Sequence, residues 1–101
     1  MSWKMAEPKT LVYLFIERDG GYEAVDEYDL EALGGEIPAV GDLIVDPGVV
    51  QGRDRNDPAN RDIYEVASRY FHPRTTDNRD VFIALLVKVR QGRPEEINIL
   101  R

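Results

Sequence analysis

The stretch at residues 81–90, Val-Phe-Ile-Ala-Leu-Leu-Val-Lys-Val-Arg, limits the fold more than any other part of the chain. Side chains alternate between the two faces of a strand, so residues 81, 83, 85, 87 and 89 share one face and residues 82, 84 and 86 the other. Both sets are apolar. A strand that is apolar on both faces belongs in the middle of a sheet or in the wall of a closed barrel. Its β-branched residues favour a strand over a helix, and we expect Leu85 to be buried.

Five more segments are predicted as strands. Residues 10–16 form a second run that is apolar on both faces, and Asp19-Gly20-Gly21 then supplies a hairpin turn, after which residues 22–26 return. Residues 43–45 form a short strand. Residues 63–71 alternate, which puts Tyr64, Val66, Ser68 and Tyr70 on one face. Residues 97–100 are predicted as a last edge strand.

These segments predict an all-β fold: a small five- or six-stranded antiparallel barrel. An SH3-like barrel is the first interpretation and an OB-like barrel the alternative. We expect one domain over residues 1–101, with residues 1–9 as a lead-in. One short helical turn is predicted near residues 29–33, because Asp29 suits a helix N-cap and Gly34 a terminator. Asp42 is expected to accept hydrogen bonds from the amides of the turn before residues 43–45.

A resemblance to known proteins rests on three elements. These are Pro38-x-Val40-Gly41-Asp42-x-Ile44, then Tyr64-x-Val66-x-x-Arg69-x-Phe71-x-Pro73, and the apolar strand ending at Arg90. Over residues 37–90 the chain resembles small uncharacterised bacterial SH3-like β-barrel proteins. The resemblance implies the barrel and transfers no activity.

Charge is unevenly distributed along the chain. The formal net charge is −6, but residues 1–50 hold three basic and eleven acidic side chains, whereas residues 51–101 hold ten and eight. An acidic chain disfavours a general nucleic-acid binder. The absence of cysteine excludes disulfides and thiolate metal sites. No apolar run approaches the roughly 20 residues of a membrane-spanning helix, so we expect a cytoplasmic protein that does not interact with membranes.

The side chains that could carry chemistry do not form a recognisable site. His72 is the one histidine, and Ser68, four residues earlier on a strand, would lie about 13 Å from it. The loop at residues 54–58 departs from a calcium loop at its fifth and sixth positions. The acidic cluster of Asp26, Glu27, Asp29 and Glu31 is interpreted as a solvated face. We therefore predict no enzyme activity, no metal site and no cofactor.

The functional prediction is an interaction module that binds another protein. The alternative is a nucleic-acid-associated barrel that uses the arginines of the second half; an enzyme acting through carboxylates is third. The aromatic residues at strand spacing are interpreted as core: Tyr13, Phe15, Tyr64, Tyr70, Phe71 and Phe82. The candidate binding residues are the loop arginines: Arg53, Arg55, Arg61, Arg74 and Arg79. We expect their two loops at opposite ends of one strand, which is unfavourable for a single basic patch.

Self-association is a separate hypothesis. Two strands that are apolar on both faces leave a face that a second copy could cover in a homodimer. The simpler interpretation is that the N-terminal segment with Trp3, or the turn at residues 30–33, covers it.

Overall fold

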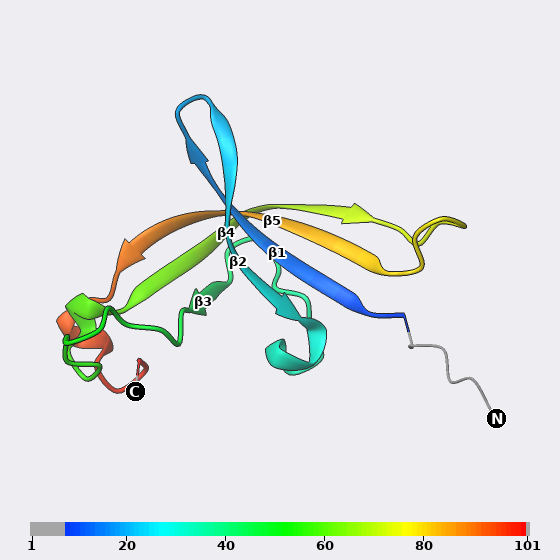
Figure 1. The fold of residues 1–101 in the computed structure, drawn as a ribbon. Helices are drawn as coiled ribbons and strands as arrows, with labels where there is room; N and C mark the ends of the chain where they lie inside the picture. Colours follow the sequence, from blue (N-terminus) through cyan, green and yellow to red (C-terminus); the bar gives the residue numbers. More distant parts are fainter. Residues whose placement is uncertain (1–7, 101) are drawn as a thin grey trace.

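The computed structural model describes residues 8–100, and these contain one five-stranded sheet. The strands lie in the order β2-β1-β5-β4-β3 (Figure 1). Their bounds are β1 Thr10–Arg18, β2 Gly21–Asp29, β3 Leu43–Val45, β4 Asp62–His72 and β5 Val81–Gln91. Three single 3-10 turns accompany them: η1 Leu30–Leu33, η2 Pro58–Asn60 and η3 Pro94–Glu96. None of the helical turns in the described part of the chain is long and apolar enough to cross a membrane.

The sheet is mixed and open, so the predicted closed antiparallel barrel is wrong. β1 runs parallel to β5, whereas the pairs β1–β2, β4–β5 and β3–β4 are antiparallel. Closure would require the two edge strands, β2 and β3, to pair with each other. Instead, η1 and the segment that leads to β3 lie across one side of the sheet (Figure 1). The all-β composition and the single sheet agree with the prediction.

The core lies on the side of the sheet that η1 covers. Val12, Leu14, Ile83 and Leu85 are fully buried there, and the side chains of Leu33, Ile37 and Ile44 pack against them. The prediction that Leu85 is buried is confirmed. The turn at residues 30–33 therefore covers the core face; the predicted cover by Trp3 lies outside the described residues.

The predicted turn chemistry is confirmed in detail. The carboxylate of Asp29 accepts a hydrogen bond from the Ala32 N–H, and Gly34 ends η1 with a φ of 73°. The carboxylate of Asp42 accepts from the Ala39 N–H at 2.8 Å. In the β1–β2 hairpin, Asp19 and Gly20 both have positive φ, as a tight turn requires.

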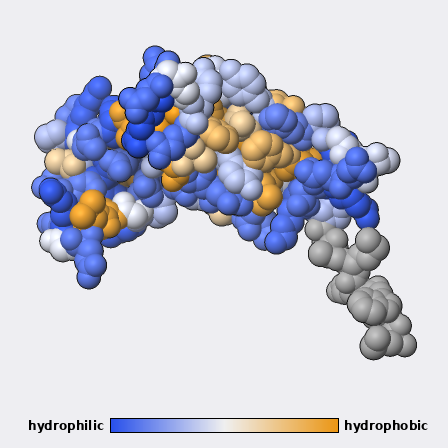
Figure 2. All heavy atoms as spheres, turned by 45° about the horizontal axis from the view of Figure 1, so that its top comes forward, coloured by the Kyte–Doolittle hydropathy of each residue, from blue (hydrophilic) through white to orange (hydrophobic). Residues whose placement is uncertain are grey.

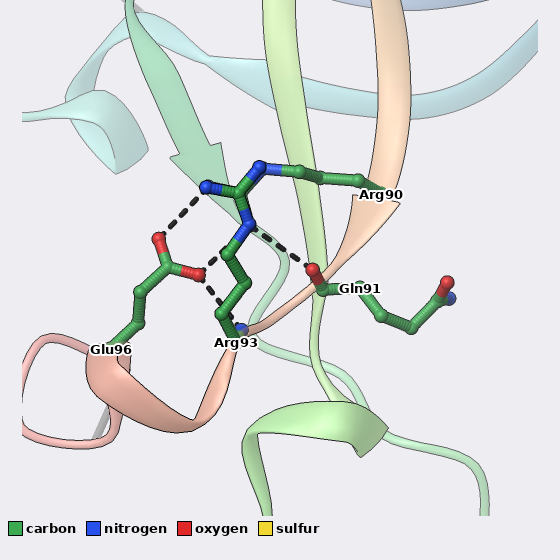
Figure 3. Close-up of polar contacts among 4 residues, drawn as sticks. All are labelled: Arg90, Gln91, Arg93 and Glu96. Carbon is green, nitrogen blue, oxygen red and sulfur yellow. Dashed lines mark hydrogen bonds and ion pairs between the residues drawn. The ribbon is translucent and has the colours of Figure 1, made fainter.

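The C-terminal segment folds differently from the prediction. Residues 97–100 form a turn after η3 and not an edge strand, and the Leu100 side chain is buried. The Glu96 carboxylate organises the start of this segment. Arg90 pairs with Glu96 through both terminal nitrogens of its guanidinium, Nη1 and Nη2, and the Arg93 N–H donates to the same carboxylate (Figure 3). The N–H groups of Ile97, Ile99 and Leu100 donate to the carbonyls of Pro94 and Glu96, so residues 97–100 continue this turn and are not available as a strand.

Candidate functional site

Three of the five predicted arginines lie at the end of the sheet where β4 begins. Arg61 is only 3% exposed: its guanidinium donates to the backbone carbonyls of Leu100 and Asp46. Arg55 is exposed and donates to the Pro47 carbonyl. Arg53 is exposed and lines a hollow beside the carboxylates of Asp46 and Asp62. A buried Arg61 fastens the C-terminal segment and is not a surface group.

The other two arginines lie at the opposite end. Arg74 and Arg79 belong to the loop between β4 and β5, and the Arg74 Nε donates to the Arg79 carbonyl. Figure 1 shows this loop, in yellow, and the residues leading into β4, in green, at opposite ends of the long hairpin. The five arginines therefore do not form one patch.

The long loop before β4 is organised by Asp54. Its carboxylate accepts from the Asn56 N–H, and its carbonyl accepts from the Asp57 N–H and the Asn60 side-chain amide. Among the described residues, no group of three or more Asp, Glu or His side chains is placed to hold a metal ion.

The aromatic residues are arranged differently from the prediction. Of the six interpreted as core, only Tyr64 is buried; Tyr70 and Phe71 are each 54% exposed. Several of them gather on the side of the sheet opposite the core. We call this surface the aromatic face, defined by Tyr13, Phe15, Tyr22, Tyr70, Phe82 and Leu86.

Strand pairing places these side chains together. In the parallel ladder Phe15 is the partner of Leu86, and Tyr13 of Ala84; in the antiparallel ladder Ala84 is the partner of Tyr70. Paired residues point to the same face of a sheet. The apolar second faces of β1 and β5 therefore lie side by side, and β4 extends them by one strand.

A bulge in β4 brings Tyr70 to this face. The register shifts between Val66 and Ser68, so that Ala67 is the extra residue. One extra residue turns every following side chain to the opposite face. Tyr64 and Val66 therefore pack in the core, whereas Ser68 and Tyr70 point to the aromatic face. The prediction that these four residues share one face is wrong for this reason.

A groove of about 300 Å³ runs across the aromatic face, lined by Phe15, Tyr22, Tyr70, Ala84 and Leu86. Ala84 and Leu86 are half-buried, whereas Tyr22 is 64% exposed. Figure 2 shows hydrophobic side chains gathered in a band across the middle of the molecule, and mostly hydrophilic side chains on either side of it. The groove is thus an apolar surface bounded by aromatic rings from three strands.

Three rings extend the face beyond the groove. The Tyr13 and Phe82 rings meet edge to face at 4.5 Å between centroids, and the His72 ring lies 4.9 Å from Phe82. Burial raises the pKa of the Tyr13 hydroxyl, and the Glu27 carboxylate raises it further. His72 is exposed and lies against an aromatic ring. No proton-transfer partner for it is found among the described residues.

The charge beside the groove is negative on the β1–β2 side. Glu17 pairs with Tyr22, and Glu27 pairs with Tyr13, so both carboxylates point to the aromatic face. Neither makes an ion pair within the described part of the chain. This edge of the face favours a positively charged group on whatever binds there.

A cluster of two tyrosine hydroxyls and two carboxylates lies on the core side of the sheet, away from the aromatic face. The Tyr28 hydroxyl donates to Asp26 at 2.8 Å, and the Tyr64 hydroxyl donates to Asp46 at 3.3 Å. Burial and the neighbouring carboxylates raise the pKa of Tyr28 above its ordinary value and that of Tyr64 to about 12. Both hydroxyls stay protonated at neutral pH and serve as hydrogen-bond donors, which suits packing and not nucleophilic chemistry.

No family model, curated sequence or solved structure matches the chain. The resemblance drawn from residues 37–90 therefore stays a prediction. The sequence signal that could have located the aromatic face is the apolar second face of residues 10–16 and 81–87, which no strand within residues 8–100 covers.

Proposed function

We propose that the chain is a non-enzymatic interaction module that binds another protein through the aromatic face. The observation that carries this proposal is the groove lined by Phe15, Tyr22, Tyr70, Ala84 and Leu86. Exposed apolar grooves with aromatic walls are typical of protein-binding surfaces, because aromatic anchors dominate binding energy. We also propose a cytoplasmic location. A chain without cysteine forms no disulfides, and this composition fits a reducing compartment.

The charge around the groove supports a protein partner over the alternative, a nucleic acid. Aromatic side chains on a sheet also suit base stacking, but a phosphate backbone requires basic side chains beside them. Glu17 and Glu27 point to this face, and the chain carries a net charge of −6. The partner that fits is a segment with an apolar anchor side chain and lysine or arginine close to it.

A displayed library of random peptides tests the proposal. It is panned on the wild-type protein, and the selected peptides are measured against the double variant Tyr22→Ala/Tyr70→Ala. Peptides with an apolar anchor and basic neighbours should bind the wild type and lose at least tenfold in affinity on the double variant. Val50→Ala/Ile99→Ala is the matched control, because both side chains are exposed and apolar but lie outside the groove.

Two results would reject the proposal. One is that no selected peptide distinguishes the groove variant from the control. The other is that single-stranded oligothymidine binds the wild type at low salt and depends on Tyr22 and Tyr70, which would establish the nucleic-acid alternative. Replacing the exposed Arg53 and Arg55 with alanine in the same titration tests the predicted surface arginines directly.

A further inference from the structure

One strand edge of the sheet is left open in the described part of the chain. β4 extends from Asp62 to His72, but β3 pairs only with Ile63, Tyr64 and Glu65. The backbone of residues 41 and 42 continues this pairing to Val66. Beyond that point no described strand lies beside residues 68–72 on the outer side.

The ladder shows which backbone groups this edge offers. Val66 faces outward, since its N–H donates to the Asp42 carbonyl and its carbonyl accepts from the Gly41 N–H. Along an antiparallel strand, the backbone N–H and C=O groups of successive residues point alternately to one neighbouring strand and to the other. The bulge at Ala67 shifts this alternation by one residue. The N–H and C=O groups of Arg69 and Phe71 therefore point away from β5, toward solvent.

The two long edges of the sheet differ in how they resist pairing. β2, at the far edge, carries a bulge and four carboxylates in nine residues: Glu23, Asp26, Glu27 and Asp29. Two such edges would place like charges together and repel each other. Residues 68–72 contain no carboxylate, lysine or proline, and Tyr70 and Phe71 are 54% exposed.

We propose that two copies of the chain form a homodimer by pairing residues 68–72 in antiparallel fashion, about a twofold axis at Tyr70. Arg69 then lies opposite Phe71 of the second copy, so the outward N–H and C=O groups of both residues are used on both chains. Ser68 lies opposite His72, the last residue of β4. The paired segment thus ends where residues 41 and 42 begin to cover the edge.

The side chains suit this register. Arg69 lies over the Phe71 ring of its own chain, 5.3 Å from the guanidinium carbon to the centroid. In the dimer a second Phe71 lies opposite it, and an arginine beside an aromatic ring is attracted to it. The two Tyr70 side chains meet on the aromatic face, so the grooves of the two copies become neighbours. The dimer does not depend on the proposed function, because its contacts are along the edge of β4.

The absence of cysteine allows a direct test of the register. Tyr70 pairs with itself at a site without hydrogen bonds, where Cα atoms are about 4.5 Å apart, a separation that a disulfide spans. Under mild oxidation Tyr70→Cys should form a covalent dimer at least tenfold faster than Ile99→Cys, an exposed control site away from the edge. Ser68→Cys and His72→Cys should crosslink when mixed, and faster than either does alone.

Sedimentation equilibrium supplies the second measurement. The wild type should have twice the 11.5 kDa mass of the chain. Phe71→Lys, which puts a second cation opposite Arg69, should shift it to the monomer, and Ile99→Lys should not. Thermal unfolding of each variant shows that it is folded. A wild-type monomer at high concentration, or equal crosslinking at residues 70 and 99, would overturn the proposal, and so would a dimer that Phe71→Lys leaves intact.

Discussion

Arg90 and Glu96 face each other across the turn after β5, joined by two parallel hydrogen bonds of 2.8 Å (Figure 3). These bonds, followed by the one from the Arg93 N–H, lower the pKa of Glu96 from 4.5 to about 2. A carboxyl group whose pKa is lower in the folded state stabilises the fold above its unfolded pKa, because the unfolded chain binds the proton more readily.

The first prediction is therefore a pH dependence. The contribution of Glu96 should be complete above pH 4.5 and should be lost as the pH falls toward about 2. Urea unfolding of the wild type and of Glu96→Gln, measured across this range, should show a smaller loss of stability for the variant. Glu95→Gln, which removes a neighbouring carboxylate outside the pair, is the control. Equal acid sensitivity of wild type and Glu96→Gln would contradict the prediction.

The second prediction concerns the core. Leu85→Ala should lower the free energy of unfolding by about 2–5 kcal/mol, through lost burial and the cavity that remains, because Leu85 is fully buried. Val50→Ala, at a side chain that is 68% exposed, should change it by less than about 0.5 kcal/mol. Chemical denaturation measures both. A cost below about 0.5 kcal/mol for Leu85→Ala would mean that β5 is not central.

The third prediction concerns Gly92. A Cβ at this position would lie 2.5 Å from the Pro58 carbonyl oxygen and would collide with the Leu100 side chain. Gly92→Ala should therefore cost about 1–3 kcal/mol, as overpacking does. Gly48→Ala is the matched control, because the nearest atom to its Cβ would be 3.4 Å away. Thermal unfolding gives the stability of each variant. If Gly92→Ala unfolds at the same temperature as Gly48→Ala, the C-terminal turn is not packed against η2.

The fourth prediction concerns Arg61. Arg61→Ala leaves the carbonyls of Leu100 and Asp46 without their donor, and should cost about 2–4 kcal/mol. Arg53→Ala, at an exposed side chain, should cost less than about 0.5 kcal/mol. Limited proteolysis should cut the C-terminal segment of Arg61→Ala sooner than that of Arg53→Ala. Equal digestion of the two variants would disprove the fastening role of Arg61.

The parts of the fold that could be predicted depend on local chemistry. The cap at Asp29, the terminator at Gly34 and the turn at Asp42 each involve a few neighbouring residues with strong conformational preferences. The burial of Leu85 followed from a strand that is apolar on both faces. The parallel pairing of β1 with β5 could not be predicted, because an apolar strand packs equally well in either direction and the choice depends on how distant segments connect.

The candidate site was missed for a similar reason. Ala67 carries no signal for a bulge, yet it decides that Tyr70 lies on the aromatic face and not in the core. The burial of Arg61 was equally hidden, since its partners are backbone carbonyls that are far away in the sequence. Charge counting found the arginines, and the position of their two loops before and after one predicted strand correctly placed them at opposite ends of the hairpin.

The parallel contact between β1 and β5 also determines how late in synthesis the core can form. Thr10 pairs with Val81, and the Lys9 backbone amide bonds to Asp80, 71 residues away. On a ribosome, the first hairpin emerges long before the strand that completes the core beside it. Until β5 is synthesised, both faces of β1 remain exposed to water and to other nascent chains. Such distant pairing slows folding, because β1 cannot be buried before β5 is available.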